Sequence, residues 1–341
     1  MEITGTAALA DPETLEAAQR GDRAAFDALV KPLQAELHAH CYRMLGSAHD
    51  ADDALQEALL GAWRGLAGFE ERSSLRSWFY RITTNACMRL GGQRRLVATE
   101  YCLPRDPAGE LGAPVTETAW VEPYPDHRLD DADPALRAEL LESVELAFVA
   151  ALQHLPATQR AVLILREVLA FSAQEVAELL DSTVASVNSA LQRARKSLHE
   201  RYSGPTQRAE LHKLGEPGRA ELVAAFVAAW ERADVPALLD LLVSDARFTM
   251  PPLPAWFEGK AAVGRFAADR LFATPWRLVP MHANGQLAFT CYQAAPDGAE
   301  FVLGAVNVLT LRDGKILEIS GFVDPAMYAD WGVPKILGAD R

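Results

Sequence analysis

The sequence is poor in cysteine and contains no long apolar run, and both shortages limit the class of protein. The four cysteines, Cys41, Cys87, Cys102 and Cys291, are scattered without paired spacing among 341 residues. We therefore expect reduced thiols in a cytoplasmic protein rather than a disulfide framework. No uninterrupted apolar stretch approaches the roughly 20 residues of a membrane span. The first residues carry neither a basic lead nor a long apolar core, so we expect no secretory signal and no membrane partner.

Clustered metal ligands are also scarce. His38, His40 and Cys41 form the closest group, but on a helix these side chains fan around the axis instead of converging on one ion. We therefore expect neither a metal nor a cofactor.

Basic residues are outnumbered, with 33 Lys and Arg against 46 Asp and Glu and a formal net charge of −13. This total argues against a protein coated in nucleic acid, but the distribution of charge matters more. Residues 72–95 contain arginines and no acidic residue, whereas residues 99–145 are rich in acids opposed only by Arg105, Arg128 and Arg137. A basic segment and a later basic helix thus flank an acidic connector.

Residues 171–201 predict two short helices joined by a sharp turn. Ser172 followed by Glu175 is a capping-box signal, and residues 181–183 supply cap oxygens for the second helix. One face of that helix is apolar. The other face is polar and basic, and it carries Ser186, Asn188, Ser189, Gln192, Arg193, Arg195 and Lys196. Such a helix suits the major groove of DNA, although an ordinary helical hairpin with a solvated face would show the same pattern.

Two earlier segments also have the character of binding surfaces. Residues 75–95 interleave arginines with aromatic side chains, and arginines bind phosphate while aromatic rings stack on unpaired bases. The alternative is a core tryptophan with arginines that merely face solvent. The helix before it begins with a run of acids, which either complements the helix dipole or forms a surface for a basic partner protein.

Length and composition divide the chain into helical and mixed parts. The helical part consists of a domain over 12–95, an extended acidic linker over 96–134, and a second domain over 135–202 that begins with one helix over 135–155. The acids of the linker fit either solubility or mimicry of a nucleic-acid backbone. A hinge over 203–218 leads to a last domain over 219–335.

Strand-like runs follow helices in this last domain, with a loop over 251–258, and they predict an α+β cone, a bent sheet wrapped round helices. Such a fold usually encloses a pocket. The candidate lining residues are Met250, Trp256, His282, Asn307 and Asp324. An acid–base pair of His282 and Asp324 is one interpretation, a sensor for a small-molecule ligand is a second, and a domain that regulates the helical part is the one we favour.

These segments resemble bacterial sigma factors of the extracytoplasmic-function type in the sigma-70 family. Residues 50–69 resemble the helix that binds core RNA polymerase, residues 75–86 the helix that reads the −10 element, and residues 155–198 the domain that reads the −35 element. Residues 246–266 and 308–325 resemble the SnoaL-like branch of the NTF2-like superfamily. Asp181 departs from the glycine frequent in helix-turn-helix turns, but aspartate also tolerates that backbone.

The resemblance implies roles for individual residues. The surface that binds the polymerase clamp would contain Asp50, Asp52, Asp53, Gln56 and Trp63. The helix that reads and opens the −10 element would use Arg76, Trp78, Tyr80, Arg81 and Asn85, with residues 69–74 holding a flipped base. The polar face of the helix after residue 183 would enter the −35 groove.

The sequence therefore predicts two all-α domains, the second with a helix-turn-helix, joined by an acidic linker and followed by an α+β NTF2-like cone. The resemblance implies a sigma factor, not an enzyme, that binds core RNA polymerase and promoter DNA and initiates transcription, with the C-terminal domain regulating activity in cis. The alternative is a helix-turn-helix regulator fused to a SnoaL-like ligand-binding or enzymatic domain.

Overall fold

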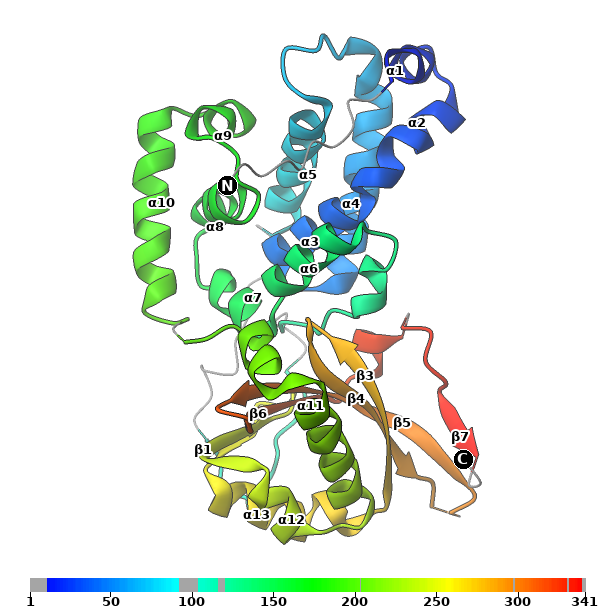
Figure 1. Cartoon of the computed structure of the whole chain (residues 1–341), viewed down its shortest axis with the longest axis vertical. Coiled ribbons are helices and arrows are strands. Elements are labelled where there is room, and N and C mark those ends of the chain that lie inside the picture. Colours follow the sequence, from blue (N-terminus) through cyan, green and yellow to red (C-terminus); the bar gives the residue numbers. More distant parts are fainter. Residues whose placement is uncertain are drawn as a thin grey trace. The chain divides into compact units, whose positions relative to one another are not determined.

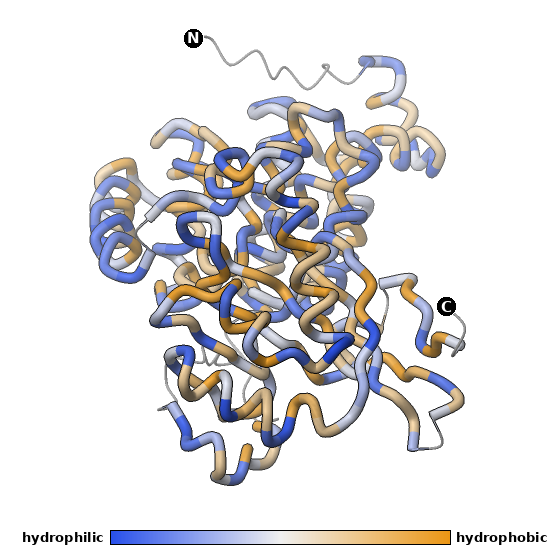
Figure 2. The backbone as a smooth tube through the Cα atoms, turned by 60° about the horizontal axis from the view of Figure 1, so that its bottom comes forward, coloured by the Kyte–Doolittle hydropathy of each residue, from blue (hydrophilic) through white to orange (hydrophobic). Residues whose placement is uncertain are grey.

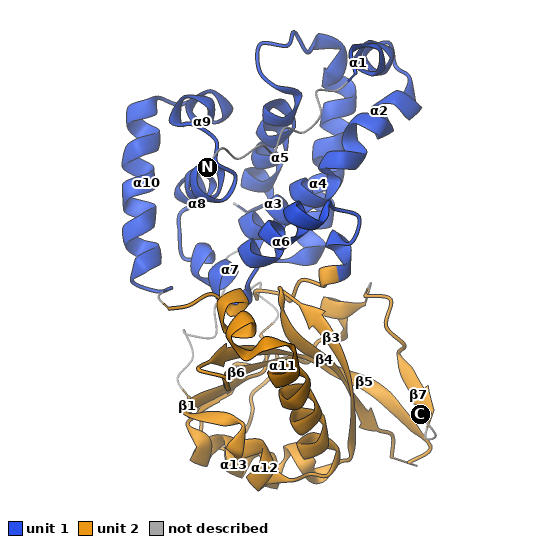
Figure 3. Cartoon of the chain, viewed as in Figure 1, with its two compact units in different colours: residues 1–95, 127–203 blue, residues 96–126, 204–341 orange. Residues whose placement is uncertain are grey.

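The computed structural model describes residues 11–91, 104–115, 120–202, 204–296, 298–329 and 331–338. The chain divides into two compact units, of which the first contains residues 1–95 and 127–203 and the second contains residues 96–126 and 204–341 (Figure 3). The expected linker over 96–134 is thus divided, because its residues up to 126 group with the C-terminal domain. The ends of the basic stretch, Arg94 and Arg95, and Cys102 lie outside the described residues.

The first half of unit 1 is helical. Its helices are α1 (Pro12–Gln19), α2 (Arg23–Val30), α3 (Gln34–Leu45), α4 (Ala48–Gly65) and α5 (Leu75–Gly91). Local signals explain their ends: Pro12 is the first residue of α1, Asp22 Oδ1 accepts from Ala24 N at 2.9 Å, and Gly46 ends α3 at φ 72°. The apolar stripe that includes Phe26, Leu33 and Leu37 is buried.

The second half of unit 1 contains α6 (Pro134–Ser143), α7 (Leu146–Gln153), α8 (Ala157–Leu163), α9 (Ala173–Leu179) and α10 (Val184–His199). A single helix over 135–155 is wrong, because the chain is non-helical at Glu145 (φ −47°, ψ 133°). The buried carboxylate of Glu145 accepts a hydrogen bond from the Tyr202 hydroxyl at 2.9 Å. A contact 57 residues away in the chain therefore stabilises the break.

The predicted capping box at α9 is confirmed. Ser172 Oγ accepts from Glu175 N at 3.2 Å, and Ser172 N donates to the Glu175 carboxylate at 2.7 Å. Asp181 adopts φ 47° in the turn, and Thr183 Oγ1 caps α10 by accepting from Ser186 N at 3.1 Å. In Figure 2, α10 is the helix at the left edge, mostly hydrophilic with apolar positions recurring along it.

Unit 2 is a curved sheet with helices against one face (Figure 1). The strands are β1 (Leu242–Thr249), β2 (Trp256–Glu258), β3 (Trp276–Ala283), β4 (Gln286–Ala294), β5 (Glu300–Arg312), β6 (Lys315–Phe322) and β7 (Ile336–Gly338). Their order is β2-β1-β6-β5-β4-β3, with β7 paired to β5, and β1 and β6 are parallel. The strand at Trp256–Glu258 corrects the expected loop over 251–258, since this segment pairs with β1. The helices are α11 (Gln207–Glu231), α12 (Val235–Asp240) and α13 (Lys260–Asp269).

The expected hinge over 203–218 is helical from Gln207 onward and belongs to unit 2. The Gln207 amide donates to Leu311 O at 3.1 Å and accepts from Leu311 N at 2.6 Å. Leu211 and Leu214 pack against the core of the cone. The glycine and proline that suggested a hinge mark a kink instead, since Gly215 has φ 66° and ψ 175° within α11. Among the described residues, no helix combines the length and hydropathy needed to cross a membrane.

His40 generates a testable pH dependence in unit 1. The imidazole is fully buried, its Nε2 lies 2.9 Å from Thr84 Oγ1, and its ring packs edge-on against Tyr80 at 5.1 Å. Burial, and then the charges of Arg43 and Arg76, hold the pKa of His40 well below its ordinary value. The folded state therefore resists a proton that the unfolded chain accepts below pH ~6.5, and this contribution to stability is lost as the pH falls.

We predict that the free energy of unfolding decreases below pH ~6.5 by at most about 1.4 kcal/mol per pH unit from this residue. The substitution His40→Asn should flatten that slope, as measured by urea unfolding followed by helical circular dichroism from pH 5 to 8. The exposed His199 on α10 provides the control, because His199→Asn should leave the slope unchanged. An identical slope in the His40→Asn variant would contradict the assignment.

Candidate nucleic-acid and protein interfaces

The outer face of α10 is the most open of the predicted surfaces. All of its candidate residues are exposed: Ser186, Asn188, Ser189, Gln192, Arg193, Arg195 and Lys196. The opposite face is buried through Val187, Ala190, Leu191 and Ala194, which holds the helix in place. Arg195 Nε donates to Glu167 Oε1 at 2.6 Å. A rigid helix thus presents a continuous polar and basic face without an acid of its own, as a reader of the major groove does.

The predicted surface on α5 is only partly open. Trp78 and Asn85 are partly exposed, and the Trp78 ring lies 5.3 Å from the Phe69 ring. The exposed Arg81 forms an ion pair with Asp181 in the turn before α10, at 3.0 and 3.2 Å. The helix predicted to contact unwound DNA is therefore bonded, in this arrangement of unit 1, to the turn of the helix-turn-helix.

The Tyr80 side chain, predicted to face DNA, is completely buried in this arrangement and is not part of an open surface. Its ring packs edge-on against Phe171 at 5.3 Å. The guanidinium of Arg76 lies over both rings, 4.9 Å from the centre of Tyr80 and 5.1 Å from that of Phe171. Arg76 also donates to the buried Glu36 at 2.9 Å. Burial, with the nearby Glu36 carboxylate, raises the pKa of Tyr80 far above its ordinary value.

Further contacts between the two halves of unit 1 are also made by arginines. Arg43 is fully buried and donates to Ser143 Oγ at 2.6 Å. Arg160 donates to Met44 O and to the side chain of Gln153, and burial lowers the pKa of Arg160 to about 10. We define Arg43, Arg76, Arg81 and Arg160 as the arginine interface of unit 1.

The predicted polymerase-facing residues lie on α4. Asp53 and Gln56 are exposed, and Trp63 is 36% exposed with its ring packed edge-on against Phe26 at 5.2 Å. Asp50 is partly exposed, and its backbone N donates to the cap residue Ser47 at 3.0 Å. The sequence pattern therefore places an acidic and partly apolar strip along one helix.

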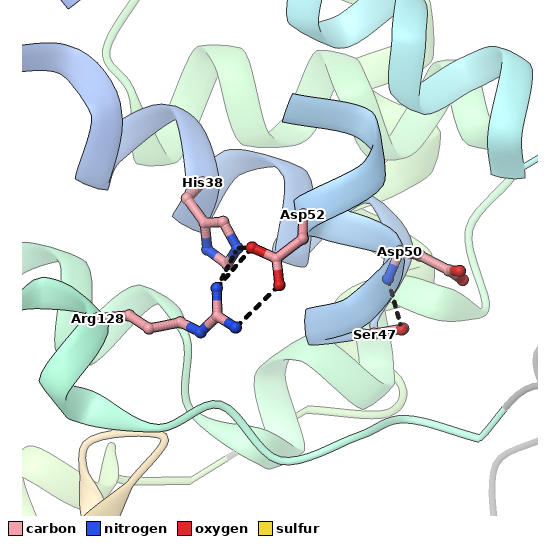
Figure 4. A network of polar contacts seen from close by, with 5 residues as sticks. All are labelled: His38, Ser47, Asp50, Asp52 and Arg128. Carbon is pink, nitrogen blue, oxygen red and sulfur yellow. Dashed lines mark hydrogen bonds and ion pairs between the residues drawn. The ribbon is translucent and has the colours of Figure 1, made fainter. Parts of the chain in front are cut away.

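Asp52 differs from its neighbours because it is already bound. Arg128 donates to both of its carboxylate oxygens, at 2.6 and 2.8 Å, and His38 Nε2 lies 3.0 Å from Oδ1 (Figure 4). Asp50 points away from this group (Figure 4). We call His38, Asp52 and Arg128 the Asp52 cluster. Burial by itself would raise the pKa of Asp52, but the hydrogen bonds from His38 and Arg128 outweigh it and hold the pKa well below its usual range.

The candidate pocket residues of unit 2 lie on different elements of the cone. Met250 belongs to the packed core, Trp256 is on β2 with the Arg247 guanidinium 5.8 Å from its ring, and His282 is exposed on β3. Asp324 caps a short 3-10 turn by accepting from Ala326 N at 3.0 Å. Asn307 is buried on β5 opposite Phe289. The proposed acid–base pair therefore consists of an exposed imidazole and a capping carboxylate.

Aromatic side chains make up much of the core of the cone. The ring centres of Phe226 and Phe289 lie 4.7 Å apart, and Phe257 stacks on Phe266 with the ring centres 4.4 Å apart. The ring centres of Trp230 and Phe248 lie 6.4 Å apart. A groove of about 530 Å³ lies between α11 and Pro280 of β3 and is lined by apolar residues such as Val223 and Val227. The residues that the structure describes bring no three metal-binding side chains together.

Part of the linker lies on the cone within unit 2. Arg105 N donates to Trp256 O at 2.9 Å, and Val115 N donates to Pro252 O at 3.0 Å. Tyr124 and Asn284 are joined twice: Tyr124 N donates to Asn284 Oδ1, and Asn284 N donates to Tyr124 O, both at 2.8 Å. Asp126 Oδ1 accepts from Gly285 N at 2.9 Å. The linker segments described here are therefore docked rather than free.

Sequence reasoning missed the residues that make these long-range contacts. Phe171 was considered only as the start of the helical pair, and Arg128 only as one of the few bases in an acidic stretch. The Asn284–Gly285 dipeptide was an available signal, since both residues have positive φ, 57° and 66°, as a tight hairpin turn requires. That signal predicts the turn but not its use as a docking point for the linker.

Three family models match the chain. They are Sigma-70 region 2 over residues 29–95, Sigma-70, region 4 over residues 145–198, and a SnoaL-like domain over residues 223–319. The first covers α3 to α5 and the second covers the helix-turn-helix, so both matches include the surfaces described above.

Relatives match over nearly the whole chain. The ECF RNA polymerase sigma factor SigG of Mycobacterium tuberculosis (strain ATCC 25618 / H37Rv) is 40% identical over 325 residues, which is 94% of this chain and 86% of that protein. The ECF RNA polymerase sigma factor SigW of Bacillus subtilis (strain 168) is 28% identical over 53% of this chain and 91% of its own length. The crystal structure of SigJ from Mycobacterium tuberculosis has the same fold, with a TM-score of 0.59 at 22% identity over 90% of this chain and 99% of that chain. With its region 2 and region 4 modules followed by a SnoaL-like domain, the chain belongs to the ECF RNA polymerase sigma factors.

Proposed function

We propose that this sigma factor works through three surfaces and is restrained by its own C-terminal domain. The acidic strip on α4 binds core RNA polymerase, α5 captures the unwound −10 element, and α10 reads the −35 element as duplex DNA. The observation that carries this assignment is the exposed, basic face of α10, held rigidly by a buried apolar face. Because one chain offers surfaces of opposite charge, it can join a protein partner to DNA.

The restraint is proposed to act through the linker. Backbone groups of residues 105, 115 and 124 are bonded to the cone, and Leu111 packs against its core. In the active complex the acidic linker is proposed to occupy the basic nucleic-acid channel of the polymerase, where it cannot also lie on the cone. Docking on the cone therefore lowers the fraction of molecules able to form that complex.

We propose that the SnoaL-like domain acts as a regulator and not as an enzyme. The ECF sigma factors are not enzymes in the catalytic sense, and in this chain His282 is exposed while Asp324 serves as a turn cap. General acid–base catalysis needs two groups within reach of one reacting atom. The function also implies action wherever core polymerase and promoters are present, which is the cytoplasm in bacteria.

The α10 assignment predicts a change in promoter affinity. Because Arg193 is exposed on the groove-facing side, Arg193→Ala should weaken binding to a −35 duplex by about 1–3 kcal/mol if the guanidinium contacts a base. The measurement is a competition assay in holoenzyme on matched and mismatched −35 sequences. Arg201→Ala, a change just after α10, should leave affinity within about 0.5 kcal/mol of the parent chain. An equal loss on every sequence would make Arg193 a phosphate contact instead.

The linker proposal predicts a gain of activity. Val115→Pro removes the N–H that donates to Pro252 O, and the loss of one such bond is worth about 1 kcal/mol. Run-off transcription by reconstituted holoenzyme should therefore rise about fivefold. Val115→Ala retains the N–H and should behave as the parent chain. Unchanged or reduced transcription with Val115→Pro, in a chain that still melts at the parent temperature, would refute restraint by docking.

A further inference from the structure

The Asp52 cluster lies on the helix assigned to polymerase binding, and this inference rests on that proposed function. Arg128 enters from the 3-10 turn Asp126–Leu129 and donates to both oxygens of Asp52. His38 from α3 contacts the same carboxylate, so Asp52 has two partners from outside its own helix. Asp50 points away from this cluster (Figure 4), and the exposed Asp53 lies 4.0 Å from His49 Nε2.

The geometry of this pair is unusually well defined for a surface contact. Two parallel N–H···O bonds join the groups, and the Arg128 side chain is only 22% exposed while that of Asp52 is 43% exposed. Isolated exposed ion pairs contribute little, but partly buried, bidentate arginine–carboxylate pairs are among the stronger polar contacts. The carboxylate remains reachable from solvent, so another cation can replace Arg128.

We propose that Arg128 is an internal competitor for the polymerase-binding surface: it occupies Asp52 in the free chain and must be displaced by a cationic side chain of core polymerase. Binding an acidic strip requires complementary positive charge from the partner. Two cations cannot form the same bidentate contact with one carboxylate. The apparent affinity for polymerase is therefore reduced by the fraction of chains in which the Asp52 cluster is formed.

The C-terminal domain is connected to this competitor by the chain itself. Within unit 2, Tyr124 pairs twice with Asn284 and Asp126 accepts from Gly285 N. Within unit 1, Arg128 binds Asp52. A single residue, His127, separates the last anchor on the cone from the competitor. The anchors of the linker on the cone and the residue that occupies Asp52 are therefore neighbours in the chain, and we infer that release of one favours release of the other.

The direct test measures the dissociation constant of the full-length chain for core RNA polymerase. Arg128→Gln keeps the length and polarity of the side chain but removes its charge, and it should tighten binding about tenfold. The matched control is Arg137→Gln, which breaks the exposed ion pair of Arg137 with Asp130 at 3.0 Å and should leave the constant unchanged. Equal or weaker binding by Arg128→Gln would overturn the proposal.

A second variant guards against a folding defect. Arg128→Lys retains the charge but loses the bidentate geometry, so it should tighten binding less than Arg128→Gln does. In an Asp52→Asn background, Arg128→Gln should give no gain, because the site that it exposes has lost its charge. A gain that persists in this background would show that Arg128 acts through another contact and would refute the competitor assignment.

The contribution of the cone is tested at the Asn284 turn. Asn284→Gly keeps the positive φ of the turn but removes the acceptor for Tyr124 N, and it should tighten binding about threefold in the parent chain and not at all with Arg128→Gln. Asp313→Gly is the matched control, since Asp313 occupies a similar turn, φ 53°, and pairs with Lys213. Additive effects of the two substitutions would refute the connection through residues 124–128. If the parent chain failed to bind core polymerase, the proposed function itself would be wrong. If the parent chain bound and Arg128→Gln did not tighten binding, only the competitor assignment would be wrong.

Discussion

The contact between the two halves of unit 1 centres on one arginine that packs against two touching aromatic rings. Arg76 lies over Tyr80 of its own helix and over Phe171 from the region 4 half, while Glu36 neutralises its charge. An aliphatic side chain at position 76 would join the two halves by apolar packing alone. A guanidinium instead keeps its affinity for anions, so the contact that joins the two halves is made by a group suited to nucleic acid. The other members of the arginine interface extend the same chemistry along α3, α5 and α8.

Local features of this fold were predictable because they depend on neighbouring residues. The capping box at Ser172 and Glu175 and the buried stripe through Phe26 and Leu37 follow from spacing alone. Strand-like runs and turn residues predicted the sheet of the cone, but the short strand Trp256–Glu258 was expected to be a loop. Errors arose where a distant part of the chain decides the outcome. Tyr80 is buried by a ring 91 positions away, and the break at Glu145 is stabilised by Tyr202.

The candidate sites also differ in whether neighbouring or distant residues determine them. The α10 face could be predicted because an amphipathic helix has one buried side, and the exposed side follows by elimination. A pocket in the cone cannot be predicted in this way, since it depends on how far side chains from several strands and α11 reach across the interior. Phe226, Trp230 and Phe289 meet there, and their sizes are visible in the sequence while their convergence is not.

The ion pair between Arg81 and Asp181 has a consequence for the order of assembly. Both side chains are largely exposed, 48% and 75%, so promoter phosphates can take over Arg81 without unfolding anything. On the proposed roles, DNA that binds Arg81 favours an open form of unit 1 in which α5 and the turn before α10 are no longer paired. Because a ligand that binds only this form must supply the free energy that the contact contributes, the ion pair lowers the affinity of α5 for DNA in the free chain. Release of Asp181 also frees the turn before α10, so capture by α5 and duplex reading by α10 are linked within unit 1.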